Sequence, residues 1–222
     1  MFAQFFDINN IFFTFLNYPM SYLEFFGTIF TALSVYLAAK NKIITWPIGL
    51  LGVVLYGFLF YQIQLYSDLI EQFYYLATGF WGWWLWAHPD KKDDLGPDNQ
   101  RKISNNKKKE NIIYGLIILV GNLGLGYFIS RVHLIFPKAF YLQASYPYID
   151  AGTTIMSFVA NYLLMKRKIE SWYLWIIVDI FGVWLYLVKG TIFLSILYFA
   201  FLINAIFGYF GWRKEVATYE KV

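Results

Sequence analysis

The residues of this chain that could take part in chemistry are a few polar side chains set inside long apolar segments. Asp179 stands in the segment Trp-Ile-Ile-Val-Asp-Ile-Phe-Gly, where an ionised carboxylate is costly unless it faces a cavity or a partner. Side chains at three- and four-residue spacing share one face of a helix. That face of Asp179 also carries Trp172, Trp175, Gly182 and Tyr186. Aromatic rings beside a carboxylate favour a flat, cationic ligand.

A second polar face is predicted from Gln72 and Tyr75, which follow the same spacing towards Trp86. The Gln72 amide both donates and accepts hydrogen bonds, so it suits a carboxamide or a hydroxyl group. A third, less polar helix face contains Tyr198 and Asn204. Asn161 is the polar residue of the fifth predicted span that we first expect to reach a ligand. The candidate binding residues are therefore Gln72, Tyr75, Asn161, Trp175, Asp179, Tyr198 and Asn204.

Each of these residues also has a purely structural alternative. Asp179 could pair with a neighbouring helix and hold the bundle together, as polar side chains within membranes often do. Asn204 could equally form a contact between helices. The sequence alone leaves both alternatives open.

The composition argues against an enzyme, a metal site and a cofactor. The chain has no Cys and only two His, so it has no disulfide, no thiolate nucleophile and too few imidazoles for a metal cluster. The two histidines, His88 and His133, are expected in loops. The net charge of +4 comes from Lys and Arg between apolar segments, which predicts membrane topology rather than binding to nucleic acid.

The elements that must position these residues are membrane helices. Of the 222 residues, 59% are hydrophobic and 23% are aromatic, and the apolar segments are long enough to cross a bilayer. We predict seven spans, at about 22–39, 43–62, 68–86, 111–130, 149–165, 172–188 and 192–212. The protein is therefore predicted to be an all-α integral membrane protein.

An internal repeat relates the first three spans to the last three. A shift of 126 positions places Glu24–Trp86 on Asp150–Trp212 without a gap. The shift matches Trp46 with Trp172 and Trp86 with Trp212, and it matches the basic turn at Lys40 with that at Lys166. One linking span between two three-helix bundles gives both halves the same direction, the parallel type of transporter repeat.

The expected organisation follows from this 3+1+3 arrangement. It comprises an interfacial segment (1–21), a first bundle (22–87), a cytoplasmic loop (88–110), a linking helix with its loop (111–148), a second bundle (149–212) and a cytoplasmic tail (213–222). Of the 18 Lys and Arg, only Arg131, Lys138 and Lys189 fall on the side opposite the long loop. The positive-inside rule then places the N-terminus outside and the C-terminus in the cytoplasm.

Two stretches resemble the PnuC family of bacterial vitamin transporters. They are Leu65–Tyr75 followed by Gly82, Trp83 and Trp86, and Trp172–Asp179 followed by Leu185–Gly190 and Tyr198. The resemblance covers about Tyr22 to Trp212. It implies a fold like that of the SWEET sugar transporters, a homotrimer in the bacterial inner membrane, and uptake of nicotinamide riboside by facilitated diffusion. It also implies that a cytoplasmic kinase traps the vitamin by phosphorylation.

Two alternatives stay open beside this function. A sister vitamin, thiamine or riboflavin, is one possible substrate, because relatives of PnuC are assigned to such compounds. A proton-coupled symporter that uses Asp179 or Glu71 as the proton carrier is the other.

Overall fold

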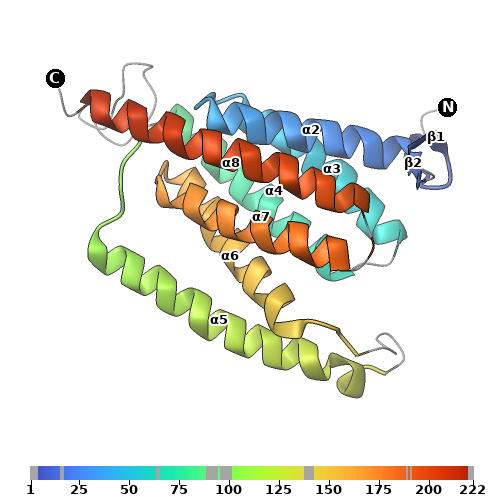
Figure 1. Ribbon diagram of the computed structural model, residues 1–222. Coiled ribbons are helices and arrows are strands. Elements are labelled where there is room, and N and C mark those ends of the chain that lie inside the picture. Colours follow the sequence, from blue (N-terminus) through green and yellow to red (C-terminus); the bar gives the residue numbers. More distant parts are fainter. Residues whose placement is uncertain are drawn as a thin grey trace. The chain divides into compact units, whose positions relative to one another are not determined.

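The computed structural model describes residues 5–15, 18–63, 66–88, 95, 102–137, 143–188, 190 and 192–219. Within these ranges the chain forms seven helices with defined bounds and one short β-hairpin (Figure 1). The helices are α2 (Tyr22–Ala39), α3 (Thr45–Gln62), α4 (Tyr66–Ala87), α5 (Lys108–Ile135), α6 (Pro147–Met165), α7 (Glu170–Val188) and α8 (Ile192–Tyr219). Most of the predicted loop 88–110 lies outside the described residues.

Each predicted span corresponds to one of these helices, and the differences lie at their ends. Helix α5 begins before the predicted span and continues to Ile135, so His133 lies in its last turn rather than in the expected loop. Helix α8 continues past Trp212 to Tyr219, because Arg213, Lys214 and Glu215 are polar but favour helices. Helix α6 begins two residues before the predicted span, at Pro147, the position where a missing amide hydrogen costs nothing.

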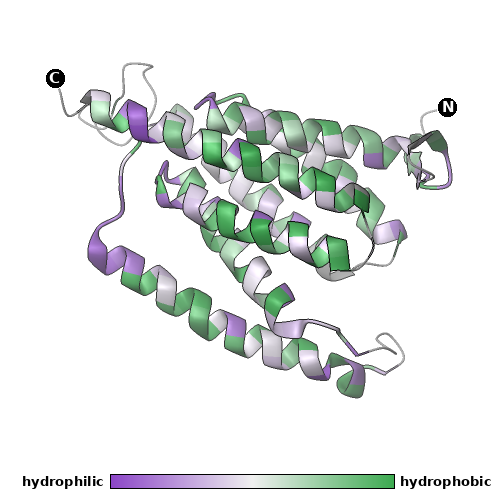
Figure 2. Cartoon of the chain, in the orientation of Figure 1, coloured by the Kyte–Doolittle hydropathy of each residue, from purple (hydrophilic) through white to green (hydrophobic). Residues whose placement is uncertain are grey.

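Five of the described helices are long and apolar enough to cross a membrane: α2, α3, α5, α7 and α8. Hydrophobic residues run along these helices, and hydrophilic residues gather at ends such as the start of α5 (Figure 2). Helices α4 and α6 are less apolar. They carry Glu71, Gln72 and Asp150, Asn161 respectively, polar residues of the kind that membrane proteins turn away from lipid.

The chain divides into two compact units. The first contains residues 1–103, 165–167 and 206–222. In it α2 packs along α3 and α3 along α4. Small residues allow the close approach of α2 and α3, since a Cβ built on Gly52 would lie 2.7 Å from Oγ1 of Thr31.

The N-terminal part of the first unit closes over one end of α2 and α3. Strands β1 (Ile11–Phe15) and β2 (Tyr18–Ser21) pair antiparallel, and Ser21 caps the start of α2. The Gln62 side chain accepts a hydrogen bond from the Ile8 amide at 3.1 Å and donates one to the Phe6 carbonyl at 2.7 Å. These bonds tie the N-terminal segment to the end of α3.

The second unit contains residues 104–164 and 168–205. Helix α5 lies against α6: a Cβ built on Gly126 would lie 2.3 Å from the Tyr148 ring, and Gly121 faces Ile155. Helix α7 lies against the first part of α8, where the Ser195 hydroxyl donates to the Val183 carbonyl at 3.1 Å. The glycines at the contact between α5 and α6 let those two helices approach closely.

Candidate binding site in the membrane helices

The predicted acidic and aromatic face of α7 is turned into the protein. Asp179 is 5% exposed and Trp172 is 1% exposed, and Gly182 is buried as well. On the opposite side of the helix, Ile180 is 51% exposed and Trp184 is 41% exposed. The Asp179 carboxylate therefore does not face lipid, and none of the described residues forms a hydrogen bond with it.

Tyr198 on α8 packs directly onto this face. A Cβ built on Gly182 would lie only 2.1 Å from Cδ1 of Tyr198, so the phenol ring occupies the space that a larger residue at position 182 would need. The Tyr198 ring is also 5.2 Å from that of Tyr186, with an interplanar angle of 35°. Because Gly182 lies one helical turn after Asp179, the structure brings Tyr198 to the face that carries the carboxylate.

Three other predicted residues belong to the same unit. Asn161 is buried in α6, whereas Trp175 on α7 and Asn204 on α8 are partly exposed. Trp175 lies one turn before Asp179 on the face already described. Their contact with a ligand stays a prediction.

Gln72 and Tyr75 lie on α4, in the first unit. The Cβ of Gln72 is 4.0 Å from a Cβ built on Gly57, so Gln72 lies on the side of α4 that faces α3. The Tyr75 ring contacts that of Tyr74 edge to face at 5.5 Å. Both side chains are half-buried, and their contact with a ligand also stays a prediction.

Sequence reasoning missed a buried arginine in the first unit. Arg167 follows Lys166 in the predicted basic turn, where a cation is expected to be solvated, yet its side chain is fully buried. Its guanidinium lies over the Trp86 ring at 4.4 Å and donates to Oδ1 of Asn41. The Asn41 amide in turn donates to the Glu215 carboxylate at 2.8 Å. Both Asn41 and Arg167 have positive φ, 57° and 53°, a conformation that is uncommon for Arg.

Two tryptophans next to this arginine cap helix ends. The indole of Trp86 donates to the Met165 carbonyl at 3.1 Å, and that of Trp212 donates to the Ala38 carbonyl, also at 3.1 Å. Both indoles are fully buried. The matched pairs in the repeat, Asn41 with Arg167 and Trp86 with Trp212, were the signal that could have revealed this cluster.

The described residues contain no group of three or more His, Cys, Asp or Glu that could hold a metal ion. The arrangement around Asp179 is instead suited to binding. A buried carboxylate beside phenol and indole rings provides electrostatic and stacking contacts for an aromatic cation.

Comparison with known proteins gives a consistent result over most of the chain. Residues 21–214 match the family model described as nicotinamide mononucleotide transporter. The nicotinamide riboside transporter PnuC of Escherichia coli K12 is 27% identical over 212 residues, which cover 88% of this chain and 87% of that protein. The riboflavin/roseoflavin transporter RibM of Streptomyces davaonensis is 25% identical and covers 92% of this chain and 91% of its own. The crystal structure of the vitamin B3 transporter PnuC aligns with a TM-score of 0.65 at 25% identity, over 89% of this chain and 83% of that one.

Proposed function

The chain belongs to the nicotinamide mononucleotide transporter family, and from this membership we propose that it carries nicotinamide riboside across the membrane. The observation that supports this substrate best is the buried Asp179 carboxylate with the Tyr198 ring packed on the same helix face. Nicotinamide riboside offers a flat pyridinium cation to these groups. A cation in contact with a carboxylate and aromatic rings is held by Coulomb and cation–π attraction together.

The remaining candidate residues have complementary roles in this proposal. Trp175 stacks on the pyridinium ring, and Gln72 recognises the carboxamide. Tyr75, Asn161 and Asn204 bind the ribose hydroxyls, since phenol and amide groups both donate and accept hydrogen bonds. The protein acts as a transporter and not as an enzyme.

The riboside is a better substrate than the mononucleotide in this proposal, although the family description names the mononucleotide. A phosphate group entering the membrane helices needs a cationic partner. In the part of the chain that the structure describes, Arg167 is the only buried Lys or Arg, and its guanidinium already contacts Asn41 and Trp86. Riboflavin is the second candidate, favoured by the similarity to RibM.

We also propose the architecture and the mode of transport. Seven spanning helices form a parallel 3+1+3 repeat like that of the SWEET transporters, with the C-terminus in the cytoplasm. The repeat is supported by the positive φ at both Asn41 and Arg167, which the 126-residue shift matches. The homotrimer, facilitated diffusion and trapping by a cytoplasmic kinase follow from the family resemblance.

Calorimetric titration of the purified protein tests the substrate. Nicotinamide riboside, nicotinamide mononucleotide, thiamine and riboflavin are titrated side by side under identical conditions. We expect saturable binding of the riboside and at least roughly ten-fold weaker binding of the mononucleotide, because its phosphate stays unpaired. Tighter binding of riboflavin or of the mononucleotide would contradict the proposal.

A further inference from the structure

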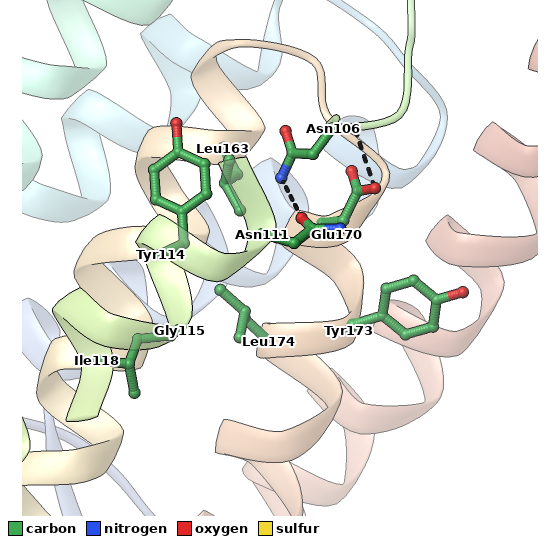
Figure 3. A pocket seen from close by; sticks show the side chains of 9 residues that line it. All are labelled: Asn106, Asn111, Tyr114, Gly115, Ile118, Leu163, Glu170, Tyr173 and Leu174. Carbon is green, nitrogen blue, oxygen red and sulfur yellow. Dashed lines mark hydrogen bonds between the residues drawn. The ribbon is translucent and has the colours of Figure 1, made fainter. Parts of the chain in front are cut away.

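A cavity with a mostly apolar lining and a polar end lies in the second unit, away from Asp179. Its volume is about 210 Å³. It is formed by the segment before α5, the first turns of α5, the end of α6 and the start of α7, and it is lined by Asn106, Asn111, Tyr114, Gly115, Ile118, Leu163, Glu170, Tyr173 and Leu174 (Figure 3). Glu170 lies nine residues before Asp179 on α7, or roughly 14 Å along the helix axis. The cavity is therefore distinct from the site proposed above.

The polar end of the cavity is built by a fixed network of hydrogen bonds. Lys168 donates to Oγ of Ser104 at 3.0 Å and to the Asn105 carbonyl at 3.1 Å. The Asn106 amide N–H donates to Oε1 of Glu170 at 3.0 Å, and the Asn106 side chain donates to Asn111 at 2.9 Å. These bonds hold the segment before α5 against the start of α7; the two that Asn106 donates are drawn in Figure 3.

The network leaves two hydrogen-bond acceptors unused. Oε2 of Glu170 and Oδ1 of Asn106 are both buried and have no hydrogen-bond partner within the described ranges. A buried carboxylate oxygen without a partner is costly. Both residues line the cavity, and none of the nine lining residues is a Lys or Arg. A ligand that fits must therefore donate hydrogen bonds, and a positive charge suits it best.

The surroundings indicate that this ligand comes from the bilayer. Lys107, Lys108 and Lys109 stand at the start of α5, where basic residues meet anionic headgroups. The next turn of α5 exposes Ile112 and Ile113, 65% and 44% of their surfaces. A Cβ built on Gly115 meets no atom within 4 Å, so the cavity wall is open at this level. This combination of basic and apolar surface suits the boundary between lipid headgroups and acyl chains.

We propose that this cavity binds the primary ammonium group of a phosphatidylethanolamine headgroup. Glu170 and Asn106 accept hydrogen bonds from the ammonium, and the basic start of α5 lies close to the lipid phosphate. The acyl chains follow the exposed apolar surface of α5. Phosphatidylcholine has a trimethylated nitrogen without N–H donors, so it leaves both acceptors unpaired.

Native mass spectrometry of the full-length, delipidated protein tests this site. Phosphatidylethanolamine and phosphatidylcholine with the same acyl chains are added at equal concentrations. The wild type should retain the ethanolamine lipid, and Glu170→Gln should reduce its retention by roughly ten-fold, because a charge-assisted hydrogen bond is lost. Asp150→Asn, which removes the same charge near the other end of α6, is the control and should retain the lipid as the wild type does.

A second variant separates binding from folding. Gly115→Leu extends an apolar side chain into the open wall without touching the polar network, so the melting temperature should be kept while lipid retention falls. Equal retention of the two lipids by the wild type would overturn the proposal. Unchanged retention in both variants would overturn it as well. Soluble phosphoethanolamine that displaces the lipid at equal concentration would assign the cavity to a free amine instead.

Discussion

At the residue scale, the proposed function depends most on where the Asp179 carboxylate lies. Its carboxylate is 5% exposed, while neighbours on the other face of α7 are exposed. This asymmetry shows that the side chain does not face lipid, as expected for an acidic residue within a membrane helix. The choice between ligand binding and pairing with another helix depends on affinity measurements at the residues beside it.

Trp175→Ala should weaken binding of nicotinamide riboside by about 1–3 kcal/mol, because the ligand loses a stacked ring in a desolvated site. Trp184→Ala on the same helix is the matched control. Trp184 is 41% exposed on the opposite face and contacts Tyr146, so its replacement should leave the affinity unchanged. Calorimetry of both variants provides the comparison. Wild-type affinity of Trp175→Ala would remove this residue from the site.

Arg167→Ala should lower the stability of the protein by about 2–4 kcal/mol, since it leaves the buried Asn41 amide oxygen and the Trp86 ring without their cation. Lys166→Ala is the neighbouring control: its ammonium lies 5.4 Å from the Trp81 ring but is partly exposed, so the expected loss is under about 1 kcal/mol. Chemical denaturation in detergent measures both. Equal stability of the two variants would contradict a structural role for the arginine.

At the scale of elements, the hydropathy of the chain predicted every helix but not every end. Apolar length marks a membrane helix strongly, and α2 begins and ends where predicted, at Tyr22 and Ala39. A span predicted from hydropathy ends at the last apolar residue. The helix itself continues for as long as its residues favour helical backbone. Helix α8 therefore runs on to Tyr219. The burial of Arg167 was not predictable from local sequence, because its partners Asn41 and Trp86 lie more than 80 residues away, in the first bundle.

Gly182→Ala tests how α7 and α8 position the candidate site. The added Cβ would lie 2.1 Å from the Tyr198 ring, so the ring or the helix must move, and ligand binding should weaken by about 1–3 kcal/mol. Gly124→Ala on α5 is the control, because its Cβ would meet nothing within 4 Å. Alanine there should stabilise the helix slightly and leave binding unchanged. If Gly182→Ala binds the riboside like the wild type, Tyr198 is not positioned by this contact.

At the scale of the whole molecule, facilitated diffusion must be distinguished from transport that a proton gradient drives. A membrane-buried carboxylate such as Asp179 is the kind of group that carries protons in coupled transporters, yet the same group serves equally as a fixed counter-charge for a cationic substrate. In the second case the substrate itself neutralises the carboxylate, and no proton needs to move. Facilitated diffusion then requires only that the loaded site open to either side of the membrane.

Uptake into kinase-free proteoliposomes distinguishes these mechanisms. The membrane potential is held at zero in this assay, because a cation also distributes according to the potential. For a uniporter, labelled nicotinamide riboside should then enter until its inside and outside concentrations are equal. A pH gradient imposed at zero potential should not change that end point, because a carrier without coupling only speeds the approach to equilibrium. Asp179→Asn should then slow uptake by weakening the substrate's contact with its counter-charge, while the end point stays the same. Accumulation above the outside concentration under a proton gradient, lost in Asp179→Asn, would instead make this carboxylate a proton carrier and replace the uniporter with a symporter.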